Sequence, residues 1–104
     1  IGFVFELMTY WRDWIEERGI DAELAHEITV KTFMGAASLA DISSEQDFED
    51  LLKKVASKKG VTEAGLNAMR EHELERVLRL SFEKAWMRVK EMEKQNENLS
   101  SQYK

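Results

Sequence analysis

One short segment of the 104-residue chain combines residue types that suit a small anion. Ser57 and Thr62 supply hydroxyls, and Gly60 supplies backbone freedom just before a stretch with helical apolar spacing. A helix N-terminus presents unpaired N–H groups and a positive dipole end, which favour a carboxylate or a phosphate. Four lysines flank the segment, at positions 53, 54, 58 and 59. The segment is therefore a candidate anion site, and the alternative is an ordinary corner between two helices with exposed lysines.

The two histidines, His26 and His72, are weak candidates for metal ligands. Neither belongs to an HExxH pattern, and the chain has no cysteine to supply a thiolate. The carboxylates lie mostly at the spacing of exposed helix surfaces, so no pair stands out as a general acid and base. We expect surface or interface histidines and no metal.

The composition excludes several classes of function. A formal net charge of −5 argues against nucleic-acid binding, which needs lysine and arginine to neutralise phosphates. The sequence has no run of 18 apolar residues, so we expect no membrane span. The five glycines form neither GxGxxG nor a P-loop, so we expect no nucleotide site in this chain. Without a signal peptide or cysteines, the sequence favours a cytoplasmic protein.

The elements that must position the candidate site are predicted to be helices throughout. The chain has no proline, and its apolar residues recur at i, i+3, i+4 and i+7. The pattern predicts an all-α bundle of about five helices over residues 1–92, followed by a polar tail over residues 93–104 that is expected to fray. The expected helices span about 4–18, 21–42, 44–55, 62–72 and 73–92.

Particular residues mark the ends of these helices. Gly19 fits the left-handed position that closes the first helix. Asp21, Ser44 and Thr62 fit the N-cap positions of the second, third and fourth helices.

Gly35, Ala36 and Ala37 lie in the middle of the second predicted helix. A glycine inside a helix costs about 1 kcal/mol relative to alanine. We therefore expect another helix to cross closely at Gly35, which makes the three residues candidates for packing or dimer contacts.

Charge and large apolar side chains both suggest association. Residues 1–52 carry 3 basic and 12 acidic residues, for a net charge of −9, and residues 53–104 carry 12 and 8, for +4. Such halves can attract each other within one chain or across a dimer, although ordinary solvated helix faces explain the same numbers. Trp11, Trp14 and Trp86, with five Phe and five Met, are many large side chains for so few helices. We expect a partner to cover part of that surface.

Two motifs resemble a known enzyme family. Residues 55–66, V-A-S-K-K-G-V-T-E-A-G-L, resemble the signature V-x-S-P/K-G-G-x-T-x-x-x-L of pyrroline-5-carboxylate reductases. Residues 32–37, T-F-M-G-A-A, resemble the family's T-x-x-G-A-A. With the aromatic start at residues 3–5 and the stretch 74–86, the similarity extends over about residues 3–90.

The resemblance implies the C-terminal helical domain of such a reductase, of the 6-phosphogluconate dehydrogenase C-terminal-like type and intertwined in a dimer. Members of the family reduce 1-pyrroline-5-carboxylate, a small anionic imine, to L-proline, and they assemble as homodimers or larger homo-oligomers. Their N-terminal Rossmann domain binds NAD(P)H, and this chain lacks it. Because the chain begins at Ile1 inside a helical pattern, we expect a domain of a longer protein, although a chain trimmed near its true start is an alternative.

Position by position, the resemblance also implies roles in the loop. Ser57 and the backbone of Lys59, Gly60 and Val61 would hold the substrate carboxylate. Thr62 would be the catalytic residue that hydrogen-bonds the ring nitrogen, so that positioning of the imine provides most of the catalysis.

Lys59 departs from the family pattern, in which a glycine precedes Gly60. A lysine takes positive φ less readily than glycine, so either the loop accommodates it or activity is altered or lost. The alternative to a reductase domain is therefore a non-catalytic helical dimerisation or interaction module. In both cases we expect this chain alone to be inactive.

Overall fold

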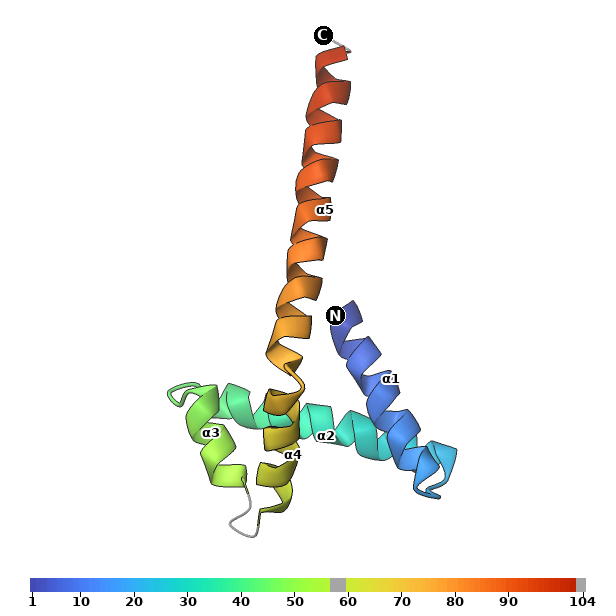
Figure 1. Cartoon of the computed structure of the whole chain (residues 1–104), viewed down its shortest axis with the longest axis vertical. Helices are drawn as coiled ribbons and strands as arrows, with labels where there is room; N and C mark the ends of the chain where they lie inside the picture. Colours follow the sequence, from blue (N-terminus) through green and yellow to red (C-terminus); the bar gives the residue numbers. More distant parts are fainter. Residues whose placement is uncertain (57–59, 103–104) are drawn as a thin grey trace. The chain divides into compact units, whose positions relative to one another are not determined.

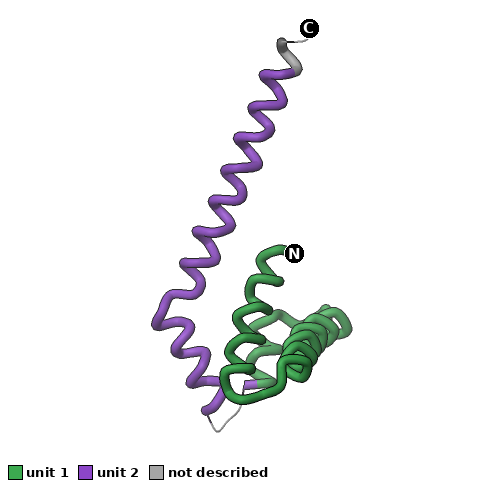
Figure 2. Tube along the Cα trace, turned by 90° about the vertical axis from the view of Figure 1, so that its right-hand side faces the viewer, with its two compact units in different colours: residues 1–55 green, residues 56–104 purple. Residues whose placement is uncertain are grey.

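A computed structural model describes residues 1–56 and 60–102 of the chain (Figure 1). The described residues form five helices and no strand: α1 (Gly2–Glu17), α2 (Ala22–Ile42), α3 (Phe48–Val55), α4 (Val61–Glu71) and α5 (Leu74–Gln102). The predicted all-α class is thereby confirmed. The helices divide between an N-terminal unit, residues 1–55, and a C-terminal unit, residues 56–104 (Figure 2).

The N-terminal unit begins with α1 and α2, which pack against each other. Gly19 closes α1 at φ 93°, and its N–H donates to the carbonyl of Glu16 at 2.9 Å. Asp21 then caps α2, because its carboxylate accepts the N–H of Leu24 at 3.4 Å. Both predictions at this corner are confirmed.

The buried residues of the described chain are Ile15, Ala25 and Thr29, and all three belong to α1 and α2. The Thr29 hydroxyl donates to the carbonyl of Ala25 at 2.8 Å, so this buried polar group is satisfied. Trp11 of α1 meets Phe33 of α2 edge to face, with ring centroids 5.1 Å apart. Such an aromatic pair contributes about 0.5–1.5 kcal/mol beyond its buried area. The α1–α2 contact is therefore the one small core of this unit among the described residues.

The third helix starts later than the sequence suggested. α3 begins at Phe48, and the carbonyl of Asp47 accepts the N–H groups of Asp50 and Leu51, both at 3.1 Å. Ser44 lies in the preceding turn, so its predicted role as the cap is wrong. The turn extends further because Gln46 donates its N–H to the carbonyl of Ser43 at 2.9 Å before the helix can start.

The C-terminal unit contains α4 and α5, which are separated by His72 and Glu73. α5 continues to Gln102, ten residues beyond the helix end expected near residue 92, and the fraying expected for the tail stays a prediction. Extending an existing helix needs no new nucleus, and residues 93–102 contain neither glycine nor proline. The i, i+3 ion pair between Lys90 and Glu93, at 3.6 Å, also spans the expected boundary.

Among its described residues the C-terminal unit buries no side chain. Val77, Trp86 and Met87 are each more than half exposed. Lys90 lies 4.6 Å above the ring of Trp86, a cation–π contact that leaves most of that ring uncovered.

In the described ranges, no helix has both the length and the apolar character that a membrane crossing demands.

Candidate functional site

The candidate anion site lies at the start of α4, in the C-terminal unit. Of the five residues predicted to hold substrate, Ser57 and Lys59 lie outside the described residues. Gly60, Val61 and Thr62 are described and form the first turn of the helix. The structural description of the site therefore rests on Gly60, Val61 and Thr62.

Gly60 is the N-cap of α4 and adopts φ 83° and ψ 3°. Glycine takes this left-handed conformation without the steric cost that a Cβ would add. The carbonyl of Gly60 accepts the N–H of Ala64 at 2.8 Å, which is the first backbone bond of the helix. The predicted need for backbone freedom at Gly60 is thereby confirmed.

Thr62 is the second residue of α4 and is half-buried, whereas Val61 is exposed. The prediction that Thr62 caps the helix is wrong, because the left-handed turn at Gly60 starts the helix before the threonine. The N–H groups of residues 61–63 have no acceptor four residues earlier within α4, so they can donate to a group outside the helix, such as a carboxylate. Thr62 adds a hydroxyl to this same turn.

The charges near the segment are mixed in sign. Glu63 lies in the first turn of α4, where it complements the helix dipole but opposes a bound anion. Lys53 and Lys54 lie in the last turn of α3, which belongs to the N-terminal unit. The described charge within the C-terminal unit therefore does not by itself favour an anion at α4.

Gly35, Ala36 and Ala37 are exposed on α2. A Cβ built on Gly35 would meet no atom within 4 Å among the described residues, apart from its own helix. The close crossing expected at Gly35 is thus not made within the described chain. A packing role for the three residues stays a prediction about an assembled molecule.

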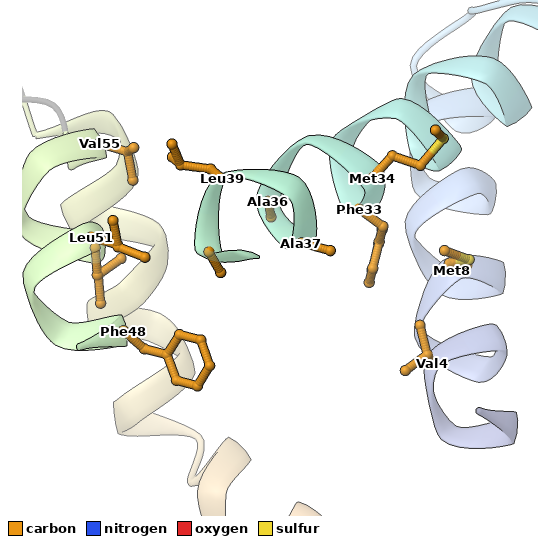
Figure 3. A pocket seen from close by; sticks show the side chains of 12 residues that line it. Val4, Met8, Phe33, Met34, Ala36, Ala37, Leu39, Phe48, Leu51 and Val55 are labelled. Atoms are coloured by element: carbon orange, nitrogen blue, oxygen red, sulfur yellow. The ribbon is translucent and has the colours of Figure 1, made fainter. Parts of the chain in front are cut away.

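The N-terminal unit also contains a feature that the sequence did not predict. It is a concave apolar surface that encloses a volume of about 700 Å³. Figure 3 shows Val4 and Met8 of α1 facing Phe48 and Leu51 of α3 across the floor formed by α2. We call this surface the apolar groove. Its lining residues are Val4, Met8, Phe33, Met34, Ala36, Ala37, Leu39, Ala40, Phe48, Leu51, Leu52 and Val55.

The groove has a signal in the sequence. Phe48, Leu51, Leu52 and Val55 follow the i, i+3, i+4, i+7 spacing of one helix face, yet Phe48 is 77% exposed. The periodicity identifies the apolar face of α3 without showing that the face lies open. An apolar surface of this kind is typical of a place where another protein surface binds.

Both histidines are exposed. Over the two described ranges, no group of three histidine, aspartate or glutamate side chains could hold a metal ion. A dinucleotide site of the Rossmann kind needs a strand that leads through a glycine-rich turn into a helix, and the described residues are helical without strands. The described residues therefore do not form a site of this kind.

Helices with open apolar faces and a small core define a class of protein, the helical association domain. Within this class, the chain matches the family described as pyrroline-5-carboxylate reductase dimerisation over residues 1–92, and it belongs to that family. The family resemblance seen in the sequence motifs is thereby confirmed.

Three curated relatives carry the name pyrroline-5-carboxylate reductase. The protein from Pseudomonas aeruginosa is 31% identical over 94 residues, which cover 90% of this chain and 34% of the relative. The protein from Vibrio alginolyticus is 32% identical over 77 residues, covering 74% and 28%. The protein from Staphylococcus haemolyticus is 29% identical over 80 residues, covering 77% and 29%. The chain thus spans about a third of the length of these relatives, and no solved structure matches it.

Proposed function

We propose that this chain is the dimerisation and substrate domain of a pyrroline-5-carboxylate reductase, an oxidoreductase that converts 1-pyrroline-5-carboxylate to L-proline in the cytoplasm. The observation that carries the proposal is the family match over residues 1–92. The three relatives named for this reaction support it. The reductant, NAD(P)H, is assigned to a part of the full-length protein outside this chain.

The proposed partner is a second copy of the chain, as a homodimer or within a larger homo-oligomer. The apolar groove supports this part of the proposal, since Phe48 and Val55 are 77% and 60% exposed in the single chain. Covering apolar surface stabilises an assembly by about 25 cal/mol for each Å² removed from water. Light scattering on the chain at micromolar concentration should therefore give at least twice 12.1 kDa.

The proposed substrate contacts lie at the start of α4. The N–H groups of the first turn would bind the substrate carboxylate together with Ser57 and the backbone of residues 59–61. The Thr62 hydroxyl would hydrogen-bond the ring nitrogen and fix the orientation of the imine. The place of Thr62 in the first turn of α4 supports this role, because its hydroxyl belongs to the same turn as the N–H groups of residues 61–63.

The test is an assay of the full-length protein with pyrroline-5-carboxylate and either NADH or NADPH. Thr62→Ala should lower kcat/KM at least tenfold, about the cost of one lost hydrogen bond in the transition state. Thr62→Ser, which keeps the hydroxyl, should restore most of the activity. Thr9→Ala is the matched control, since Thr9 is also half-buried and its hydroxyl donates to the carbonyl of Phe5 within α1. Unchanged activity in Thr62→Ala would remove this residue from the site.

A second candidate function is a non-catalytic helical dimerisation module of a reductase-like protein. Lys59, in place of the glycine that the family pattern carries, favours this alternative. A full-length protein that forms the dimer but oxidises neither NADH nor NADPH with the substrate would establish it. Lys59→Gly should then raise activity if the lysine is what prevents it.

A further inference from the structure

The junction between α4 and α5 holds a residue in an unusual backbone conformation. Glu73 has φ 56°, the one positive φ of a non-glycine residue among those described. For L-residues other than glycine, the left-handed region brings Cβ against the following carbonyl, so such a residue persists where its surroundings impose it.

The local sequence contains nothing that requires a break at this point. Residues 66–102 include neither glycine nor proline, and Ala68, Met69 and Arg70 before the junction are strong helix formers. In one continuous helix, the N–H groups of residues 74–76 would donate to the carbonyls of residues 70–72. Local preference therefore favours a straight helix from α4 into α5.

At the bend, the N–H of Glu73 donates to the carbonyl of Arg70, three residues earlier, at 3.1 Å. On either side the ordinary helical bonds are kept: His72 donates to the carbonyl of Ala68 at 3.0 Å, and Val77 donates to that of Glu73 at 3.2 Å. Glu73 itself pairs with Arg76 at 3.5 Å, but both side chains are mostly exposed, so the pair contributes little.

Packing at the junction is also light. Met69 and Leu74 line a shallow surface at the bend, and they are 42% and 37% exposed. The bend between α4 and α5 thus requires Glu73 to adopt a left-handed conformation that glutamate disfavours. Few contacts within the described C-terminal unit stabilise that conformation. Contacts from outside this unit are the remaining source of stabilisation for the bend.

We propose that Glu73 is a hinge at which α4 and α5 switch between the bent arrangement and one continuous helix, and that assembly of two copies selects the bent form. The second half of this statement rests on the proposed dimer. The hinge sets the direction of α4, and hence of the turn formed by Gly60, Val61 and Thr62, relative to α5. Assembly would in this way control the geometry of the substrate site.

Substitutions at residue 73 can bias the hinge in both directions. Glu73→Gly removes the steric cost of the left-handed conformation and should favour the bent form, roughly 5- to 30-fold. Glu73→Val adds a β-branched side chain, for which positive φ is a severe outlier, and should favour the continuous helix. Glu75→Val is the matched control, because it removes a carboxylate and adds the same side chain two residues later inside α5.

The measurement is the distance between spin labels on Asn67→Cys and Lys84→Cys in the full chain, diluted with unlabelled copies. The native chain has no cysteine, so the labels attach only at these sites. A continuous helix places the two Cα atoms about 25 Å apart, and the bend brings them closer. Glu73→Val should populate the long distance, whereas Glu73→Gly and Glu75→Val should keep the short one.

Sedimentation of the same variants tests the link to assembly. Glu73→Val should weaken the dimer about tenfold, and Glu73→Gly should leave it unchanged or tighter. An unchanged distance distribution in Glu73→Val, with helix content retained by circular dichroism, overturns the hinge. A straightened helix with unchanged dimer affinity overturns the link to assembly alone. A parent chain that stays monomeric contradicts the proposed dimer, while the distances still decide the hinge.

Discussion

The two units are both built from amphipathic helices, but among the described residues only the N-terminal unit buries side chains. There, α1 and α2 enclose Ile15, Ala25 and Thr29, while α3 leaves its apolar face open to the groove. In the C-terminal unit, α5 runs for 29 residues with no described side chain buried. An apolar helix face that its own chain does not cover stabilises the protein only when another surface covers it. The N-terminal unit thus has a small core of its own among the described residues, and we expect association to cover apolar faces in both units.

The largest expected effect comes from a charge placed in the apolar groove. Leu51→Asp should weaken the dimer at least 100-fold, because burying an unpaired carboxylate costs several kcal/mol. Analytical ultracentrifugation over a range of concentrations measures the change. Lys53→Asp is the control, since Lys53 is exposed on the same helix and makes a larger change in charge. Equal effects of the two substitutions would show that the groove stays open in the assembly.

A pair of truncations compares the cores of the two units directly. Ile15→Ala should lower the free energy of unfolding by about 2–3 kcal/mol, the lower part of the range for a large-to-small core change. Val77→Ala, at a side chain that is 56% exposed in the single chain, should cost less than about 0.5 kcal/mol in a monomer. If a second copy covers α5, the cost at Val77 rises to about 1 kcal/mol and depends on protein concentration in urea denaturation.

The smallest expected effect is the change in stability on substituting Gly35. Its sign shows whether a helix of a second copy crosses α2 at this residue. Gly35→Leu should stabilise an uncovered α2 by about 0.5–1 kcal/mol, because leucine favours the helix and no described atom lies within 4 Å of the new Cβ. If a helix of a second copy crosses there, the same change should instead weaken the dimer by about 1–3 kcal/mol through overpacking. Thermal unfolding at low and high concentration separates the two results, and Gly65→Leu in α4 is a control at another helical glycine.

Much of the fold could be predicted from residue spacing. The apolar period and the absence of proline correctly indicated five helices, and the types of Gly19 and Asp21 correctly placed the corner between α1 and α2. Ser44 and Thr62 were wrongly assigned as caps, because several hydroxyl residues near a turn satisfy the same rule and the backbone path selects among them. At α4 the N-cap residue is Gly60, which has no side chain that could accept a hydrogen bond from the helix.

The candidate site was predictable in part. The type of Gly60 indicated backbone freedom, which the left-handed turn uses, and the loop motif indicated which hydroxyl to test. The apolar groove was not predicted, because periodicity shows that a helix has an apolar face but not whether another element covers it. The positive φ of Glu73 gave no signal at all, since glutamate ordinarily favours the right-handed helix.

The sequence by itself determined the helical class, the corner at Gly19 and Asp21, and the family, because these depend on residue type and short-range spacing. Only the tertiary structure decided where α3 and α4 start, that Glu73 turns left-handed, and that the face of α3 stays open. The helix starts and the left-handed Glu73 depend on the backbone path through the turns, which several residue types near a turn allow equally well. The open face of α3 depends on whether another segment covers it, which the residue types of α3 do not determine.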